Sequence, residues 1–320
     1  MAYDVVICNP VLHPDIILYP ADGATITYAR VLPIHRREMR IGAGGYTGIA
    51  MSRLGLRCCC IDKIGSDIFG QFTRQEMELY GLDMSHVTVH PGDHMFCVIF
   101  AQDGEGGTMA CSYPPEFSET TFREVANMVA GAPPGKLMYV YSWFWSFFQP
   151  GMAGEPTHEI VRDATARGYT IMLDVNYKPK ETPPGFELAE LRKALPYVEV
   201  LLPNMRDAEI MVGRLNPVDT VRALLDLGAN VVVLKAGEEG CYLGSAEGIV
   251  HIPAPAVSVL DTTGAGDIFG GGFAYGWLQG WEVERSGAFA NAAAAYSISH
   301  EKAYKYPTLT ELEEFIGRCN

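Results

Sequence analysis

Residues 261–280 of the chain read DTTGAGDIFGGGFAYGWLQG, a stretch in which two aspartates flank small residues and a glycine-rich apolar run follows. The preceding letters VSVL predict a strand that ends at Asp261, and TTGAG predicts a tight turn. The run from Asp267 to Gly280 has the apolar content of a buried helix. The segment therefore predicts a strand, a glycine turn and a helix in immediate succession.

The predicted turn places three small residues, Gly264, Ala265 and Gly266, at the N-terminus of that helix. Backbone N–H groups at this position have no partner within the helix and lie at the positive end of its dipole, so they can bind an anion. Asp267 would repel such an anion, but it suits a general base that takes a proton from an attacking hydroxyl. Alternatively, Asp267 only favours the helix start through the dipole. The residues alone leave both interpretations open.

Composition limits the classes of partner. The chain has 320 residues, 48% of them hydrophobic, which is enough for a sizeable core. Its formal net charge is -14, from 24 basic and 38 acidic residues, and this excess argues against nucleic acid or an anionic membrane as a partner. The sequence contains no long uninterrupted apolar stretch and no basic region before its first apolar segment. We therefore expect a cytoplasmic protein without a membrane span.

The cysteines predict small core residues. Eight are present, three of them adjacent as Cys58, Cys59 and Cys60, and no C-x-x-C pair occurs. Adjacent strand positions point to opposite faces, which suits neither a disulfide framework nor a metal cage. We expect reduced thiols packed in the interior.

Short β-rich runs alternate with helical patterns along most of the chain. Six runs that are apolar on both faces predict buried strands of a parallel sheet: YDVVIC, CCCIDKI, KLMYVYS, YTIMLDVN, VEVLLPN and NVVVLKAG. Helices are predicted between them at 46–54, 67–80, 122–131, 157–167 and 218–227. This alternation predicts a doubly wound α/β fold that binds ligands at the carboxyl ends of its strands. With no long linker in the sequence, we expect one domain over 1–320.

Two stretches, roughly 15–40 and 94–112, contain strand-like segments without intervening helices. MFCVIFAQDGEGGTMACS resembles a hairpin with a glycine-rich turn at 103–107. These strands predict either a small projecting sheet that acts as a lid or an ordinary antiparallel edge.

The segment DTTGAGD closely resembles the C-terminal signature of the ribokinase (PfkB-type) carbohydrate kinase family. Residues 48–83 resemble the family's N-terminal signature, and LDVNYKP, LLPNMRDAE, LKAGEEG and FANAAAAYSIS match further segments in the family's order. The resemblance covers almost the whole chain. It implies a ribokinase-like parallel α/β sheet sandwiched by helices, with a small β lid. It also implies transfer of the γ-phosphoryl of ATP to a sugar or nucleoside hydroxyl, with Mg²⁺.

The resemblance assigns roles to the substrate residues. Asp267 matches the catalytic base, Gly264, Ala265 and Gly266 match the anion hole, and Asp15 matches the aspartate that binds sugar hydroxyls. The family's glycine pair followed by asparagine appears here as IGAGGYTG, which places Gly42, Gly44 and Tyr46 at the sugar. Tyrosine in place of asparagine would change which sugar fits.

The resemblance likewise places the nucleotide. Asn204 and Asp207 match an N-x-x-E motif that organises Mg²⁺ through water, with aspartate in place of glutamate. Lys235, Gly237 and Gly240 match a T-x-G-x-x-G turn, with lysine where threonine is common. This lysine either reaches a phosphate as a point charge or is a solvated strand end. Thr262 matches a nucleotide contact. Asn291 matches a position near the adenine, or it is a helix-interior asparagine that faces solvent.

Two further assignments stay open. Asp261 and Thr263 match part of a monovalent-cation (K⁺) site, but Lys302 stands where the other half has glycine, so a lysine either replaces the cation or points away. Trp143, Phe144 and Trp145 would stack on a sugar or base, or would pack in the core or against a subunit.

The sequence thus predicts an ATP-dependent sugar kinase. A nucleoside kinase of the same fold and a non-catalytic sugar- or nucleotide-binding relative are the alternatives. Pairing of lid strands across a homodimer is compatible with the pattern.

Overall fold

A computed structural model describes residues 2–9, 11–20, 31–102, 105–112, 114, 120–142, 154–176, 185–301 and 305–319. The side chains of 101–102, 105–109 and 185–187 are not part of this description. Trp143, Phe144, Trp145, Lys302 and the tip of the predicted 103–107 turn lie outside the described residues.

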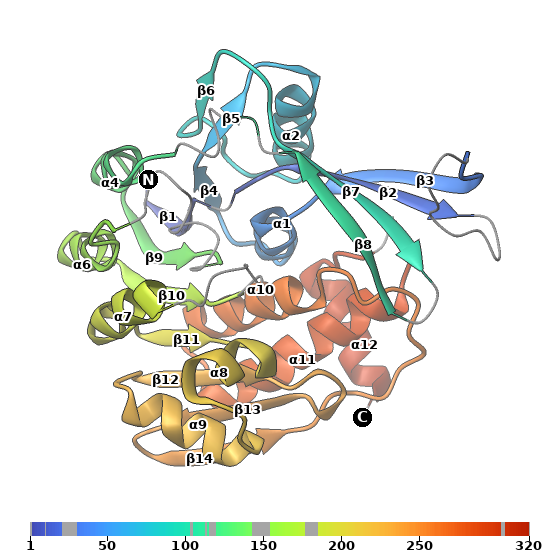
Figure 1. The fold of residues 1–320 in the computed structure, drawn as a ribbon. Helices are drawn as coiled ribbons and strands as arrows, with labels where there is room; N and C mark the ends of the chain where they lie inside the picture. Colours follow the sequence, from blue (N-terminus) through green and yellow to red (C-terminus); the bar gives the residue numbers. More distant parts are fainter. Residues whose placement is uncertain are drawn as a thin grey trace.

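An eight-stranded sheet forms the centre of the molecule, in the order β14-β13-β12-β11-β10-β9-β1-β4 (Figure 1). The strands β12, β11, β10, β9, β1 and β4 pair with their neighbours in parallel. At the other edge, β13 pairs antiparallel with both β12 and β14. The strands are β1 (Tyr3–Cys8), β4 (Cys58–Ile61), β9 (Gly135–Val140), β10 (Thr170–Asp174), β11 (Val200–Leu202), β12 (Val231–Lys235), β13 (Cys241–Ser245) and β14 (Gly248–Ile252).

Helices cover both faces of this sheet, which confirms the predicted α/β class. On one face lie α1 (Gly44–Arg53), α2 (Ile68–Leu79), α10 (Ala265–Leu278), α11 (Val283–Ser299) and α12 (Leu309–Cys319). On the other lie α4 (Phe122–Ala130), α6 (His158–Ala166), α7 (Gly185–Ala194), α8 (Met205–Val212) and α9 (Pro217–Asp226). The described part of the chain also contains two short 3₁₀ turns, η2 (Leu195–Tyr197) and η3 (Gly237–Glu239).

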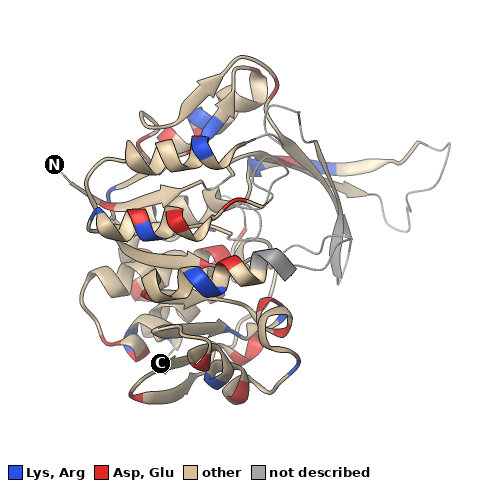
Figure 2. Cartoon of the chain, turned by 60° about the vertical axis from the view of Figure 1, so that its left-hand side comes forward, with Lys and Arg blue, Asp and Glu red and all other residues tan. Residues whose placement is uncertain are grey.

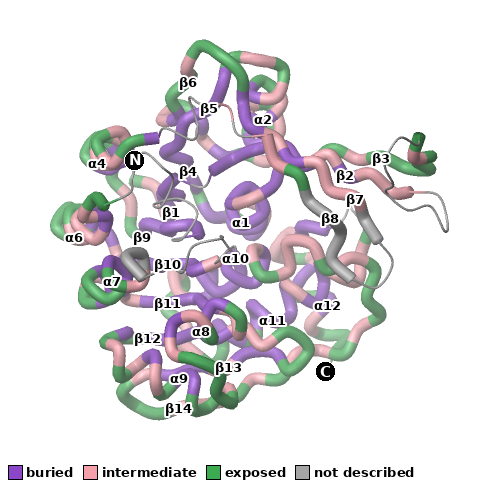
Figure 3. The backbone as a smooth tube through the Cα atoms, in the orientation of Figure 1, coloured by how far each residue is buried: buried purple, intermediate pink, exposed green. Residues whose placement is uncertain are grey.

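The strands contribute alternate side chains to two apolar cores. In β1, Val5 and Ile7 belong to the core under α1 and α10, whereas Val6 and Cys8 belong to the core under α4 and α6. Figure 3 shows the buried residues concentrated in these strands and in the helices nearest to them. Burial on both faces explains why these runs are continuously apolar.

Glycines allow α10 to approach three neighbours closely. A Cβ added at Gly270 would lie 2.3 Å from the Tyr139 hydroxyl oxygen, and one at Gly271 would lie 2.9 Å from Ala50. At Gly272 it would lie 3.1 Å from Ala290 of α11. The glycine-rich run after Asp267 therefore serves close packing of the helix against β9, α1 and α11.

A second sheet has four strands in the order β3-β2-β7-β8 and projects to one side of the main body (Figure 1). Its strands are β2 (Pro14–Pro20), β3 (Ile34–Ile41), β7 (Phe96–Gln102) and β8 (Glu105–Ser112). Strands β2 and β7 pair in parallel, and β7 and β8 pair antiparallel. A third, two-stranded sheet joins β5 (Lys63–Gly65) to β6 (Thr88–His90).

The expectation of reduced thiols throughout is wrong for one pair. Cys97 and Cys111 lie opposite each other in β7 and β8 and form a disulfide. Cys8, Cys58, Cys59, Cys60 and Cys241 are free and buried, as expected, and Cys319 is free and exposed. Sequence spacing did not reveal the pair because cross-strand register depends on the hairpin geometry.

The predicted strand before Asp261 is also wrong. No strand occurs between 253 and 264, and Val259 is 56% exposed. Pro253 and Pro255 lack N–H donors for a sheet ladder, and the segment instead bonds to α11 through the Ile298 carbonyl. Helix α10 begins at Ala265, two residues before the predicted start.

The surface helices carry mixed charge. In the view of Figure 2 basic residues lie beside acidic ones on the helices. Arg162 lies 3.4 Å from Glu159 in α6, and Arg222 lies 2.6 Å from Asp219 in α9. Among the described residues, no helix is both long enough and apolar enough to cross a membrane.

Candidate active site

A cavity of about 530 Å³ lies where the two sheets and the N-terminus of α10 meet. Its walls contain most of the site residues predicted from the sequence: Asp15, Tyr46, Asn204, Lys235, Gly237, Thr262, Thr263, Gly264, Ala265, Gly266 and Asp267. Predicted residues that do not line it are Gly42, Gly44, Asp207, Gly240, Asp261 and Asn291. The fold thus brings together residues from both ends of the chain.

Gly264 forms the turn that starts α10. It is the N-cap residue and has φ 78°, a left-handed conformation that favours glycine. A Cβ there would also lie 2.7 Å from the Tyr46 ring. The Ala265 N–H bonds to the Thr262 carbonyl at 3.2 Å, and Gly266 follows in the first turn of the helix. The positive end of the α10 dipole therefore faces the cavity.

Asp267 lies in the first turn of α10 and is oriented by a tyrosine. The Tyr141 hydroxyl hydrogen-bonds to Asp267, and the Asn176 amide donates to the Tyr141 oxygen at 2.9 Å. Burial, together with the negative charge of Asp267, raises the pKa of Tyr141 well above its ordinary value. The hydroxyl is therefore a donor to the carboxylate. Sequence reasoning assigned no role to Tyr141 or Asn176, although both lie near the ends of predicted strands.

Asp15 is buried and lines the cavity, with Gly42 directly behind it. A Cβ at Gly42 would lie 2.5 Å from the Asp15 carboxylate, so glycine leaves the space that this side chain occupies. The Gly42 N–H donates to the His13 carbonyl at 2.7 Å, which ties the two segments together. Gly44 is the first residue of α1 and is buried.

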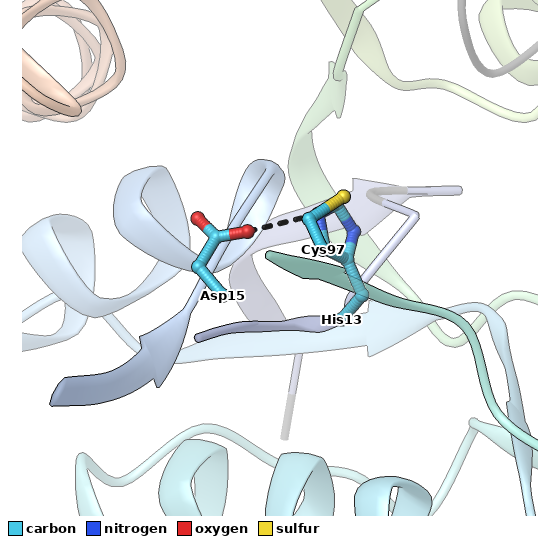
Figure 4. Close-up of side chains that lie close together, drawn as sticks. All are labelled: His13, Asp15 and Cys97. Atoms are coloured by element: carbon cyan, nitrogen blue, oxygen red, sulfur yellow. Dashed lines mark ion pairs between the residues drawn. The ribbon is translucent and has the colours of Figure 1, made fainter. Parts of the chain in front are cut away.

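His13 is a cavity residue that sequence reasoning missed. Its Nδ1 lies 2.8 Å from the Val11 carbonyl, which requires a proton on that nitrogen, and its Nε2 lies 3.3 Å from Asp15. Figure 4 shows His13 and Asp15 beside Cys97, with ligand atoms of all three within 4.8 Å of one another. The Cys97 sulfur is bonded to Cys111, so it is not the thiolate that a metal requires.

Tyr46 lines the cavity, and its hydroxyl is buried. The residue is 2% exposed, and its oxygen has no hydrogen-bond partner within the described part of the chain. Burial raises the pKa of Tyr46 above its ordinary value, and Asp15 and Asp267 add to this while Arg40 opposes it. A buried hydroxyl without a partner costs free energy.

Lys235 lies beside the turn at the start of α10. Its ammonium is 3.0 Å from the buried Asp174 carboxylate, which also accepts from the Tyr139 hydroxyl at 3.0 Å. A Cβ added at Gly266 would be 3.9 Å from the Lys235 nitrogen. Burial opposes the charge of Lys235, but the nearby aspartates outweigh burial and raise its pKa. Sequence reasoning assigned no role to Asp174, which lies within a predicted strand and ends β10.

Asn204 and Asp207 cap α8 reciprocally. The Asp207 N–H donates to the Asn204 side chain at 2.9 Å, and the Asn204 N–H donates to the Asp207 carboxylate at 3.0 Å. Asn204 lines the cavity, whereas Asp207 is buried behind it. The pair therefore holds a helix start at the cavity, a role that the N-x-x-E match did not reveal.

Gly240 and Asn291, which the sequence assigned to the nucleotide, instead contact the segment of this chain that follows β14. Gly240 has φ 92°, and a Cβ there would lie 2.2 Å from the Ile252 carbonyl oxygen. The Asn291 amide donates to the same carbonyl at 2.9 Å and to that of Pro253 at 3.3 Å. Both residues thus fix the segment that follows β14.

Asp261 accepts hydrogen bonds from three segments of the chain. One carboxylate oxygen accepts from the Thr263 N–H at 2.9 Å. The other accepts from Arg40 at 2.9 Å and from Lys305 at 3.1 Å. Burial alone would raise the pKa of Asp261, but Lys305, the Thr263 N–H and Arg40 outweigh it and hold the pKa well below its ordinary value. Sequence reasoning missed both Arg40 and Lys305.

Comparison with known proteins identifies the family. The model of the pfkB family carbohydrate kinase matches residues 19–309, so the chain belongs to this family. The aminoimidazole riboside kinase of Salmonella typhimurium (strain LT2) is 27% identical over 267 residues, which cover 82% of this chain and 79% of that protein. The deoxyribokinase of Salmonella typhi is 24% identical over 310 residues, which cover 91% and 95%.

Solved structures share the fold. A candidate ribokinase II from E. coli in complex with ATP and Mg²⁺ superposes with a TM-score of 0.82 at 20% identity, covering 99% of this chain and 100% of that one. The aminoimidazole riboside kinase from Salmonella enterica gives 0.75 at 21% identity, covering 98% and 99%. These structures confirm the ribokinase-like fold expected from the sequence.

Proposed function

We propose that this member of the family is an ATP-dependent kinase that phosphorylates a hydroxyl of a sugar or nucleoside. The observation that carries the proposal is the position of Asp267 in the first turn of α10, in one cavity with Asp15 and the dipole end of the helix. The relatives named for riboside and deoxyribose phosphorylation support the same acceptor class.

The acceptor is held at one end of the cavity. Asp15 accepts hydrogen bonds from sugar hydroxyls, a strong interaction because the acceptor is charged. Tyr46 lines the cavity where the family has asparagine, and its bulk limits which acceptor fits. Asp267, held by Tyr141, takes the proton of the attacking hydroxyl. That oxygen bonds to the γ-phosphorus while the bond to the bridging oxygen of ADP breaks, and ADP leaves with the electron pair.

The nucleotide phosphates lie at the N-terminus of α10. The Gly266 N–H and the helix dipole stabilise negative charge on the transferred group. The Lys235 ammonium adds a point charge beside the same turn. Asn204 lines the cavity and would supply a hard oxygen donor to Mg²⁺ held through water, and such an ion would neutralise phosphate charge. Asp207 is buried behind it and would act on the ion only by holding Asn204 in place. A free monovalent cation at Asp261 is not part of this proposal, because Arg40 and Lys305 already pair with that carboxylate.

The small sheet is the lid of this site in our proposal. Cys97 and Ile99 of β7 and Cys111 of β8 line the cavity together with residues of the main body. Closure of such a sheet over the acceptor would exclude water. Pairing of its outer strands across a homodimer stays a prediction, which size-exclusion chromatography with light scattering would test.

ADP release from Mg·ATP tests the function directly. The acceptors are pentoses, hexoses, sugar acids, polyols, sugar phosphates and nucleosides, and calorimetry measures binding of each in parallel. Turnover with one acceptor class supports the proposal and identifies the class. Binding without turnover across the whole panel would contradict it and favour the non-catalytic alternative.

A further inference from the structure

The ammonium of Lys305 lies directly beneath the turn that forms the anion-binding end of α10. It is 3.1 Å from the Asp261 carboxylate and 3.4 Å from the backbone carbonyl of the same residue. The other carboxylate oxygen of Asp261 holds the Thr263 N–H at 2.9 Å. One cation therefore anchors the first residue of the DTTGAGD turn by both its side chain and its backbone.

The rest of the C-terminal segment holds Lys305 in place. Lys305 is 1% exposed. The next residue, Tyr306, is buried against Tyr46, with ring centroids 6.1 Å apart, and its carbonyl accepts from Arg53 of α1 at 3.1 Å. These contacts fix the backbone from which the ammonium reaches Asp261, and they connect it to the ring that packs against Gly264.

A free monovalent cation does not fit beside Asp261. Family resemblance assigns such an ion to Asp261 and Thr263, where carboxylate and carbonyl oxygens would surround it. Here the Lys305 ammonium donates to both the backbone carbonyl and one carboxylate oxygen of Asp261. The Arg40 guanidinium donates to the same carboxylate oxygen, at a distance of 2.9 Å. A third cation would be repelled by both charges at close range.

We propose that the Lys305 ammonium takes the place of the monovalent cation and makes the kinase independent of K⁺. The inference rests on the proposed function. Lys305 is a positioning residue: it neutralises Asp261 and holds the turn that presents the α10 N–H groups. An ammonium group matches K⁺ in charge and is similar in size. Because it is tethered to the chain, its effective concentration at the site is set by the fold and not by the medium.

Arg40 adds a second link to the same carboxylate. It comes from β3 of the small sheet. Arg40 thus precedes Asp261 in the sequence, whereas Lys305 follows it. Asp261 therefore joins the small sheet, the turn and the C-terminal segment. This arrangement predicts that loss of the Lys305 charge weakens the turn even though Arg40 remains.

The experiment compares the wild type with Lys305→Ala at constant ionic strength, in tetramethylammonium chloride and with K⁺ or NH₄⁺ added. We expect wild-type turnover and melting temperature to be the same in all three salts. Lys305→Ala should lose about 10- to 100-fold in turnover without K⁺, because the turn is misplaced. It should regain turnover and melting temperature as K⁺ or NH₄⁺ fills the space left by the side chain.

Two control variants separate the charge from packing. Lys305→Met keeps most of the volume without the charge, so it should lose turnover and show no recovery with K⁺. Lys63→Ala removes another buried lysine, which pairs with Glu124 at 3.3 Å and does not line the cavity. It should lose stability without acquiring any dependence on K⁺.

The outcomes distinguish this inference from the proposed function. If K⁺ increases the turnover of the wild type or raises its melting temperature relative to tetramethylammonium, the inference is overturned and the kinase function stays intact. Full turnover of Lys305→Ala without K⁺ would also overturn it. If no acceptor is phosphorylated, the proposed function fails, and the melting temperatures still decide whether Lys305 replaces the ion. If Lys305→Ala does not fold, the wild-type measurements alone decide.

Discussion

The Lys235 ammonium lies 3.0 Å from the Asp174 carboxylate. The two residues end β12 and β10, two parallel strands separated by β11, and Asp174 is buried. Neither could be buried at this edge without a partner, because an isolated charge in the interior is costly. The pair therefore places a cation beside the α10 turn at little net cost.

Lys235→Met should weaken use of ATP. Loss of a charged hydrogen-bond donor to phosphate should raise KM for ATP about 10- to 100-fold, with little change in KM for the acceptor. The unfolding free energy should fall by about 3 kcal/mol because Asp174 is left buried and unpaired. Steady-state kinetics and urea denaturation measure the two effects. The double variant with Asp174→Asn should recover stability but not activity, and recovery of both would contradict the phosphate role.

Asp267→Asn should keep acceptor and nucleotide binding while turnover falls by about two or more orders of magnitude, as expected for loss of a general base. The amide retains the size of the side chain, so the fold should be preserved. Single-turnover kinetics together with calorimetric binding test this. Near-normal turnover in the variant would remove Asp267 from the mechanism.

Tyr141→Phe should lower kcat about tenfold without changing KM, because one hydrogen bond that orients Asp267 is lost. The ring, which is buried, is kept. In the Asp267→Asn background the same substitution should have little further effect. An additive loss in the double variant would show that Tyr141 acts independently of Asp267.

Gly42→Ala should disrupt the acceptor site specifically. Its Cβ would lie 2.5 Å from the Asp15 carboxylate, so the carboxylate must move. We expect KM for the acceptor to rise about tenfold or more, consistent with displacement of a positioning group, at unchanged KM for ATP. Gly317→Ala in α12 is the matched control, because an added Cβ there meets no atom within 4 Å. An equal effect of both substitutions on KM would contradict this assignment.

Acid should destabilise the protein through His94. Burial, with a smaller effect of His13, lowers the pKa of His94 to about 4. Its Nδ1 accepts from the Gly65 N–H at 3.2 Å and its Nε2 lies 3.2 Å from the Thr73 hydroxyl, which fits the neutral ring. Above pH 6.5 neither state is protonated at this ring. Between about 6.5 and 4 the unfolded state binds the proton and the folded state does not, so stability falls as pH falls.

The expected loss from His94 is about 2 kcal/mol at pH 5 relative to pH 7.5, at 1.36 kcal/mol per pKa unit. Urea denaturation at the two pH values measures it. His94→Gln should be less stable at pH 7.5 but should lose less on acidification. An identical pH dependence in the variant would exclude His94 as the source.

Local pattern predicted much of the fold. Continuous apolar runs identified β1, β9, β10, β11 and β12, because burial on both faces leaves a direct signature in the sequence. The segment CCCIDKI was predicted as one strand but forms β4 and β5. The hairpin β13–β14 and the helices α7, α8, α11 and α12 were not predicted. Helix α11 is rich in alanine and largely buried, so it lacks the contrast between polar and apolar faces that marks a surface helix.

The candidate site was predicted only in part, and two of the residues missed lie at the ends of central strands. Tyr141 follows β9 and Asp174 ends β10. Their roles depend on which strands are neighbours in the sheet. Conversely, Asn291 and Gly240 matched motifs, but they do not line the cavity and instead contact the segment that follows β14.

The sequence by itself determined the glycine turn, the helix that follows it and the position of Asp267 in its first turn, because these depend on residues only a few positions apart. Only the tertiary structure decided the partners of Asp261. Arg40 lies 221 residues away and Lys305 lies 44 residues away in the chain. Contacts over such separations follow from how the two sheets and the C-terminal segment pack, and no local periodicity records them.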